Sequence, residues 1–282
     1  MTGTSSAIVG PGTQPSEDDG SVLEYMEMPT NMRTYSAPAL PEPEETQGIE
    51  RALALLAEVR LAAASVAAGQ AARSFDITGL DATNREFIDQ VLGDGEVSIV
   101  AGASILAQES VLAGIWRLQE TDVTGVLKRD SIEVGAFPAA VLDVAHVAAL
   151  ECMRSHRGAL PQGVLNAPPL VTELDDKIAA YGPGVSAHVI NLTLLPQTEE
   201  DLAFLDERLG SGSVTILSRG YGNCRITSTG TRNAWWVRYF NSRDAIVLNT
   251  IEVAEVPSVA CAAEEDLADS AQRLGEILEV YR

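Results

Sequence analysis

The chain has few of the residues and motifs from which most enzyme active sites are built. Its three cysteines, at positions 152, 224 and 261, are widely separated and odd in number, which excludes a disulfide framework. It has three histidines, no phosphate-binding loop and no recognisable Ser/His/Asp arrangement. We therefore expect reduced thiols, no bound cofactor and a function other than catalysis.

Basic residues are also scarce. The chain holds 19 Lys and Arg against 40 Asp and Glu, a formal net charge of −21 over 282 residues. A surface of this sign repels phosphates, so general binding to nucleic acid is excluded. Hydrophobic residues make up 46% of the chain, which is ordinary for a protein with a buried core.

Long apolar runs are missing as well. The most apolar predicted helix, at about 52–68, is interrupted by Glu58 and Arg60, which excludes a bare membrane span. The first twenty residues are polar and carry three acids at 17–19, so they do not resemble a signal peptide. These features predict a cytoplasmic protein.

What the chain does contain is a repeat of itself. Three segments return in the same order at offsets of 115 to 119 residues: 76–80 as 191–195, 92–99 as 209–216, and 131–134 as 250–253. So long a period indicates two copies of a whole small domain rather than a solenoid repeat. We expect an acidic tail at 1–46, a first repeat domain at 47–157, a linker at 158–169 and a second repeat domain at 170–282.

Apolar periodicity and capping residues give each copy the same series of elements. In the first copy we expect helices at about 49–68, 83–92 and 138–153, and strands at 75–80, 96–101, 104–111, 113–118 and 130–134. In the second copy we expect helices at about 171–181, 198–209 and 264–280, and strands at 188–194, 213–218, 223–229, 234–241 and 245–253. Runs of strands bracketed by helices predict an α+β fold with antiparallel sheets.

The tail at 1–46 is rich in Gly, Pro, Ser, Thr and acids, which is typical of a disordered or extended segment. Its stretch at 25–29, with Met32 and Tyr35, is more apolar than a linker needs. We interpret this stretch as a strap that lies on a domain or on a partner.

One pair of residues has the spacing of metal ligands. Cys152 and His156 are four residues apart on a predicted helix and would share a face. Two ligands are too few for a structural zinc site. The favoured interpretation is a core thiol beside a surface histidine, with no metal.

The segment 218–225 has no counterpart in the first copy. It reads Ser-Arg-Gly-Tyr-Gly-Asn-Cys-Arg, and its glycines and asparagine suit a β-hairpin turn. A turn alone does not explain a thiol flanked by two arginines, because nearby positive charge favours the reactive thiolate. The candidate binding residues in this segment are Arg219, Tyr221, Asn223, Cys224 and Arg225.

The wider stretch 209–243 contains no acid and five arginines, and it is a candidate docking face for a carboxylate-rich partner. Trp235 aligns with Trp116 at the 119-residue offset, so we assign it to the core. Trp236 and Arg238 point to the other side of the strand and have no such counterpart. Two interpretations stay open: an exposed interface pair, or a strand buried on both sides.

In the first copy, the comparable segment without a counterpart in the other copy is Gln108-Glu109-Ser110. Gln108 and Glu109 either contact a partner or lie on an edge strand of the sheet. The edge strand is the favoured interpretation.

Several of these segments together resemble a known family. The runs 188–196, 201–205 and 218–229, with the segments 108–110 and 114–117, closely resemble the HupH/HoxQ/HyaF family of hydrogenase expression and formation proteins. The resemblance extends over nearly the whole chain, and the segment 219–225 matches the family's most distinctive run. It implies a cytoplasmic accessory protein for uptake [NiFe]-hydrogenases that acts on the iron–sulfur small-subunit precursor before export. It also implies a thioredoxin-like maturation protein as second partner, and no established catalytic reaction.

Two hypotheses of different classes follow. The first is a maturation chaperone that holds the small-subunit precursor through the arginines of the second copy. The second is thiol chemistry at Cys224, in redox protection or in iron–sulfur cluster assembly or repair. A stable cluster ordinarily needs four thiolates, which three dispersed cysteines do not supply.

Overall fold

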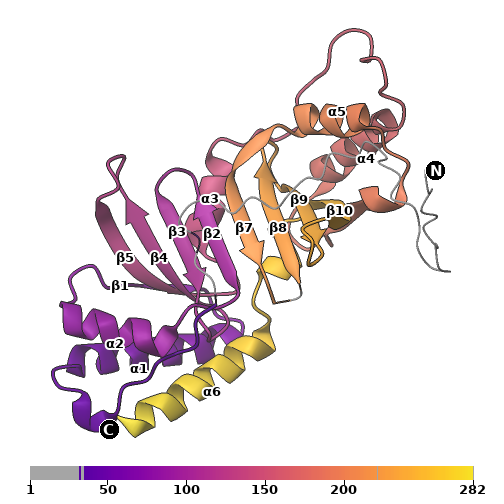
Figure 1. Cartoon of the computed structure of the whole chain (residues 1–282). Helices are drawn as coiled ribbons and strands as arrows, with labels where there is room; N and C mark the ends of the chain where they lie inside the picture. Colours follow the sequence, from indigo (N-terminus) through magenta and orange to yellow (C-terminus); the bar gives the residue numbers. More distant parts are fainter. Residues whose placement is uncertain (1–31, 33–34, 221, 282) are drawn as a thin grey trace, which may run out of the picture.

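The computed structural model describes residues 32, 35–220 and 222–281. The described residues form a mixed structure of helices around one sheet (Figure 1). The helices are α1 (Glu50–Ala67), α2 (Ala82–Leu92), α3 (Ala139–Val147), α4 (Ala167–Ala180), α5 (Glu199–Leu209) and α6 (Glu264–Val280), with short 3₁₀ turns η1 (Pro43–Glu45), η2 (Leu192–Leu194) and η3 (Ser258–Ala260).

The sheet has ten strands, and all its pairings are antiparallel. The strands are β1 (Arg73–Asp76), β2 (Val97–Ala101), β3 (Ile105–Glu109), β4 (Ile115–Thr121), β5 (Leu127–Val134), β6 (His188–Asn191), β7 (Ser211–Ser218), β8 (Asn223–Thr229), β9 (Ala234–Phe240) and β10 (Ile246–Val253). Their order across the sheet is β1-β5-β4-β3-β2-β7-β8-β9-β10-β6. The predicted antiparallel α+β character is confirmed.

The two predicted segments meet in the middle of this sheet. Residues 47–157 supply β1 to β5, and residues 170–282 supply β6 to β10. From its outer edge to the middle of the sheet, the first set runs β1-β5-β4-β3-β2 and the second runs β6-β10-β9-β8-β7, so the two sets have the same order. β2 pairs with β7 from Val97↔Ser218 to Ala101↔Val214, so the two halves share one sheet. The duplication itself stays a prediction.

Local sequence signals explain where the matching helices begin and end. The Asp81 carboxylate accepts a hydrogen bond from the Asn84 amide at the start of α2, and Thr198 forms a capping box with Asp201 at the start of α5. Each of these helices ends at a glycine with positive φ, Gly93 or Gly210, a conformation that side chains disfavour. The predictions for both helices are confirmed.

The paired tryptophans occupy matching places. Trp116 on β4 and Trp235 on β9 are both buried, and the indole N–H of each donates to a backbone carbonyl, of Gly135 at 3.0 Å and of Ala254 at 3.1 Å respectively. The two acceptors are separated by the same offset as the two tryptophans. The prediction that Trp235 belongs to the core is confirmed.

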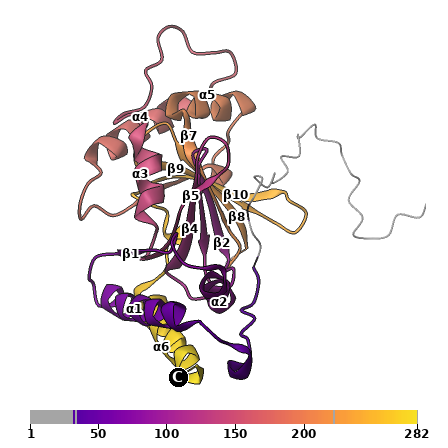
Figure 2. The ribbon, with the colours of Figure 1, turned by 90° about the vertical axis from the view of Figure 1, so that its left-hand side faces the viewer.

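Three apolar cores lie along the sheet. One joins α1, α2 and α6 to β1 and β5, and another joins α4 and α5 to β6, β9 and β10. The third lies on the opposite face, where α3 and η3 cover the central strands β2, β3, β7 and β8 (Figure 2). The two sets of helices at the ends of the sheet are visible in Figure 1.

α6 crosses from the second half to the first. Its apolar residues Leu267, Leu274 and Leu278 lie in the same core as Leu56 of α1 and Phe87 of α2. The C-terminal helix therefore completes the core of the N-terminal half.

Several predicted boundaries differ. The strand expected at 188–194 ends at Asn191 and is followed by η2, and the strand expected at 130–134 begins at Leu127. The helix expected at 138–153 ends at Val147, and the strand expected at 75–80 ends at Asp76. α4 begins at Ala167, so it takes up the end of the predicted linker. Pro168 and Pro169 lie in its first turn, where a proline costs no intrahelical hydrogen bond. Over the described part of the chain, no helix has both the length and the apolar composition to cross a membrane.

Candidate functional site

A row of mostly polar residues crosses one face of the sheet. Residues directly opposite one another in neighbouring strands point to the same side. The registers place Arg117, Gln108, Ser98, Leu217, Arg225, Arg238 and Asn249 in such a row, from β4 to β10. We call this side of β2, β3, β7 and β8, together with Arg238 of β9, the open face, because none of the three cores of the described chain includes a side chain from this region.

At the first-half end of the row, Arg117 forms ion pairs with a buried and with an exposed carboxylate. The guanidinium of Arg117 donates from Nε and Nη2 to the two carboxylate oxygens of Asp130, each at 2.6 Å, and its Nη1 lies 2.9 Å from Asp89 of α2. Asp130 is fully buried, and such a bidentate pair fixes the orientation of both side chains. Nothing in the sequence marks Asp130 as part of the site, because its partner lies on another strand.

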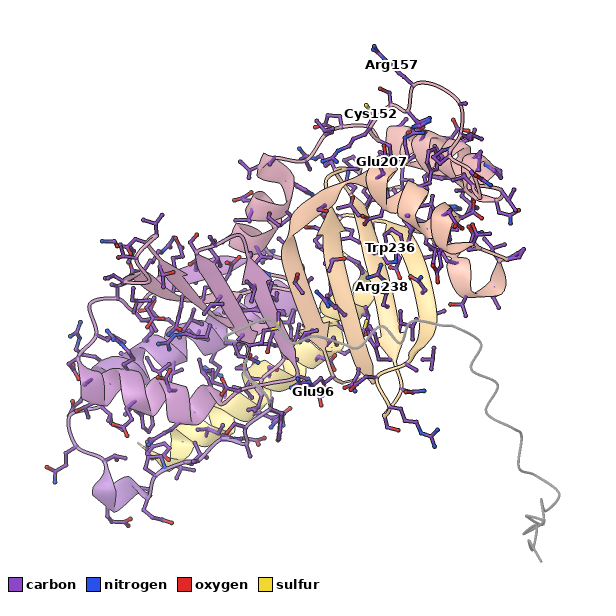
Figure 3. All side chains as sticks on the ribbon, turned by 45° about the horizontal axis from the view of Figure 1, so that its top comes forward. Glu96, Cys152, Arg157, Glu207, Trp236 and Arg238 are labelled. Atoms are coloured by element: carbon purple, nitrogen blue, oxygen red, sulfur yellow. The ribbon has the colours of Figure 1, made fainter. Side chains whose placement is uncertain are left out.

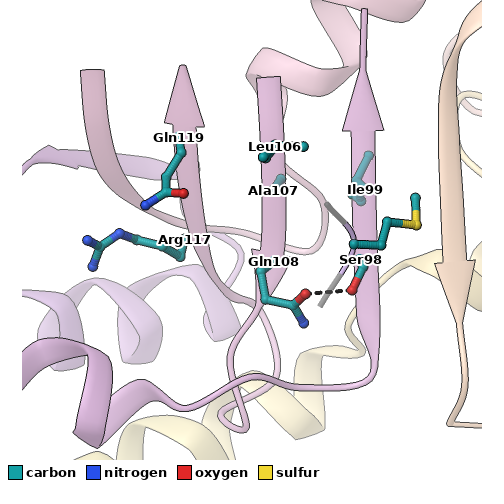
Figure 4. A pocket seen from close by; sticks show the side chains of 8 residues that line it. Ser98, Ile99, Leu106, Ala107, Gln108, Arg117 and Gln119 are labelled. Carbon is teal, nitrogen blue, oxygen red and sulfur yellow. Dashed lines mark hydrogen bonds between the residues drawn. The ribbon is translucent and has the colours of Figure 1, made fainter. Parts of the chain in front are cut away.

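Next in the row, Gln108 accepts a hydrogen bond of 2.5 Å from the Ser98 hydroxyl and donates to the carbonyls of Gly95 and Glu109 (Figure 4). A small cavity lies beside this pair, and Met32 lines it together with Leu106 and Arg117. Met32, predicted to belong to a strap, thus lies on the open face. Tyr35 is 59% exposed, and the rest of the predicted strap, at 25–29, lies outside the described residues.

The second-half end of the row carries two arginines. Arg225 and Arg238 are directly opposite each other on β8 and β9. The Arg238 guanidinium lies 4.7 Å from the ring centroid of Trp236, a cation–π contact, and both residues lie on the same strand (Figure 3). Like charges directly opposite in a sheet repel each other, so this arrangement favours an anion close by.

Trp236 is not an exposed interface residue. It is 4% exposed, packs in the core with α4 and α5, and donates its indole N–H to Asn249 at 2.5 Å. Of the two interpretations of this strand, the buried one is confirmed. An exposed pair with Arg238 is wrong, because α4 and α5 cover this part of the face.

Cys224 is not a reactive thiol. It is 1% exposed in the core on the opposite face, and burial raises its pKa to about 12. The expected lowering of its pKa is wrong because Arg225, the next residue in β8, points to the other side of the sheet. Asn223 and Arg219 are half-buried at the ends of the hairpin strands, and Tyr221 lies outside the described residues.

Thiol labelling will test this placement. In the native protein we expect a thiol reagent to modify Cys152, which is exposed, first, and half-buried Cys261 more slowly. Cys224 should react last, at the rate of local or global unfolding. Mass spectrometry over a time course gives the order, and a Cys152→Ser variant is the control that should remove the fast phase. Rapid modification of Cys224 in folded protein would contradict the structure.

Gln108 and Glu109 do not lie on an edge strand. β3 has β2 on one side and β4 on the other, so the prediction of a sheet edge is wrong, and both side chains are 8% exposed. The Glu109 carboxylate accepts a hydrogen bond from the Gly114 amide at 3.1 Å. Burial, together with the like charges of Glu96 and Asp266, raises its pKa to about 7.

The favoured interpretation of Cys152 as a core thiol on a helix is wrong, because Cys152 is exposed and α3 ends at Val147. Cys152 and His156 lie in the connection after α3, and His156 instead packs edge-on against Phe204 of α5, with 5.2 Å between ring centroids. Among the residues described, no group of three or more His, Cys, Asp or Glu is placed to hold a metal ion.

The chain matches known proteins over most of its length. The model of the HupH hydrogenase expression protein, C-terminal conserved region, matches residues 49–151 and 164–281. The chain is 52% identical over 278 residues to the hydrogenase expression/formation protein HupH of Rhodobacter capsulatus, covering 97% of this chain and 96% of that one. It is 45% identical to HoxQ of Cupriavidus necator (96% and 95% covered) and 32% identical to the hydrogenase-1 operon protein HyaF of Escherichia coli (99% and 97%).

Among solved structures, the hydrogenase expression protein HupH from Thiobacillus denitrificans is 30% identical to this chain. The match covers 39% of this chain and 92% of that one, with a TM-score of 0.37.

Proposed function

The chain belongs to the HupH hydrogenase expression protein family, and on that premise we propose that it is an accessory protein in hydrogenase maturation. In this proposal it acts in the cytoplasm and binds the precursor of the iron–sulfur small subunit of an uptake [NiFe]-hydrogenase before export. A thioredoxin-like maturation protein is the second partner. The protein works by holding the precursor and not by catalysis.

The observation that carries the proposal is the family match along nearly the whole chain, to relatives named expression and formation proteins. The open face supports a binding role, because it presents Arg225 and Arg238 in a protein whose net charge is −21. Guanidinium groups of this kind bind carboxylates of a polypeptide partner. We place the contact at this face and at Arg219, Asn223 and the neighbouring Tyr221, with Gln108 as part of its floor.

The thiol hypothesis has no support in the geometry. Nucleophilic or metal-binding chemistry needs the thiolate, and a pKa of about 12 keeps Cys224 protonated at neutral pH. Glu109, Cys224 and Trp236 therefore serve the fold of the site, and the contact with a partner is assigned to the arginines.

Co-purification tests the proposal. In cells that accumulate the small-subunit precursor, the tagged wild-type protein should retain the precursor. The triple variant Arg219→Glu, Arg225→Glu, Arg238→Glu should retain about tenfold less, since each lost charge pair contributes on the order of 0.5 to 1 kcal/mol. The matched control is Arg51→Glu, Arg129→Glu, Arg273→Glu, which changes the net charge equally at exposed positions of the first half and of α6.

Equal retention by the two triple variants would contradict the arginine surface. Failure of the wild-type protein to bind the precursor at all would contradict the proposed function. Circular dichroism of each purified variant verifies that it is folded.

A further inference from the structure

We propose that residues 24–31 of this chain dock on its own open face, with the carboxylate of Glu27 beside Arg225 and Arg238. The segment would run from β2 across β7 and β8 to β9. This inference concerns the isolated protein and does not depend on the identity of any partner.

Met32 fixes where the docked segment starts. Its side chain lines the same cavity as Ser98 of β2 and Gln108 of β3. Just beyond it, Ser36 forms a two-hydrogen-bond bridge with Asp94, of 2.8 and 3.1 Å, immediately before β2. The chain preceding Met32 therefore emerges on the open face and not at a distant end of the molecule.

The distribution of charge on the open face favours one direction for the segment that precedes Met32. Residues 1–31 contain five acids, among them Glu24 and Glu27, and no Lys or Arg. Toward β4 and α2 the face is already occupied by the carboxylates of Asp89 and Asp130, which pair with Arg117. Toward β8 it presents Arg225, which forms no ion pair within the described part of the chain.

The Nε of Arg225 adds a second indication. It is shielded from solvent and makes no hydrogen bond to any other described group. A buried donor left unpaired costs about 1 to 3 kcal/mol, so such a group ordinarily has a partner in the complete molecule. A carboxylate that lies between β8 and β9 would satisfy it.

The distances fit Glu27. Neighbouring strands are about 4.8 Å apart, which places Arg225 and Arg238 about 10 and 14 Å from Ser98 across the sheet. Glu27 precedes Met32 by five residues, an extended reach of about 17 Å. An extended chain would carry Glu24 to the far side of β9 or to β10, and the acids at 17–19 beyond the sheet.

The open face also has a buried apolar residue. Leu217 lies in the row between Ser98 and Arg225 and is 3% exposed, yet it belongs to none of the three cores formed by the described residues. Tyr25, Met26 and Met28 flank Glu27 in the sequence. In the proposed docking, these side chains would lie against the Leu217 part of the face.

Limited proteolysis of the full chain tests the docking. A glutamate-specific protease cuts after Glu17, Glu24 and Glu27, and each rate is normalised to the same bond in a synthetic peptide of residues 12–36. In the folded protein we expect cleavage after Glu24 and Glu27 to be slowed about tenfold or more, because a docked segment is cut only when it opens. Cleavage after Glu17 should match the peptide.

Charge variants identify the contact. Arg225→Glu with Arg238→Glu should bring the rates at Glu24 and Glu27 to the peptide value, and 1 M salt should act in the same direction. The control pair Arg51→Glu with Arg273→Glu changes the net charge equally and should leave protection intact. In a Glu24→Lys, Glu27→Lys variant, a lysine-specific protease should cut after positions 24 and 27 at the peptide rate. Adding Arg225→Glu and Arg238→Glu to this variant reverses both charges of the contact and should slow the two cleavages again.

Each remaining outcome overturns the proposal. Equal normalised rates at all three bonds would show that the face does not hold this segment. Protection that rises with protein concentration, together with a dimer in sedimentation, would assign the face to a second copy. Protection that appears only after the small-subunit precursor is added would assign it to the partner.

Discussion

Replacing Leu274 by alanine should lower the free energy of unfolding by about 2 to 5 kcal/mol, the usual cost of a cavity at a fully buried leucine. Leu274 is on α6, yet it packs with Leu56 of α1 in the core of the first half. The mutation therefore weakens the N-terminal half from a position on α6, in the second half of the sequence.

Chemical denaturation measures the total loss, and hydrogen exchange shows where it falls. We expect amides of α1, α2 and β1 to lose protection before those of α4 and α5. The matched control is Val280→Ala, a truncation on the same helix at a side chain that is 58% exposed, which should cost less than about 0.5 kcal/mol. Loss of protection confined to α4 and α5 would contradict the packing described above.

The second large effect is a dependence on pH at Glu109. Its pKa is about 7 in the folded protein against an ordinary value of 4.5, because the carboxyl is buried near Glu96 and Asp266. Between these two values the folded protein holds a proton that the unfolded chain has released. Stability therefore falls as pH rises from about 4.5 to about 7 and stays lower above that range.

Glu109→Gln removes this loss, since the amide oxygen can still accept the hydrogen bond from Gly114. We expect the variant and the wild type to be equally stable near pH 4.5. Above pH 7.5 the variant should be more stable by about 3 kcal/mol, from about 1.4 kcal/mol for each unit of pKa displacement. Denaturant titrations at a series of pH values measure the difference. Glu265→Gln, at an exposed position of α6, is the control, and a constant difference across the range would contradict the buried carboxyl.

Local signals in the sequence predict most elements of this fold. The strand at 223–229 and the helix at 264–280 have the predicted bounds, because alternation and capping are written within the elements themselves. The packing of α6 against α1 is not predictable in this way. An amphipathic helix shows which of its sides is apolar, but not which part of the chain will cover that side.

The candidate site likewise has features that the sequence predicts and features that depend on contacts between distant parts of the chain. The sequence locates the arginines, and strand alternation places Arg225 and Cys224 on opposite faces. It does not show that the face around Cys224 is buried, which reverses the direction of its pKa shift. The pairing of β2 with β7, which brings Gln108 and Ser98 into one row with Arg225, likewise depends on contacts between residues more than a hundred positions apart.

The position of α6 has a consequence for synthesis. Domains generally fold as units, N-terminal first, while the ribosome is still elongating the chain. Here α1 packs against α2 and β5, but its contact with α6, which ends at Val280, forms only after α6 has been translated. The core of the nascent N-terminal half therefore stays incomplete until α6 has left the ribosome.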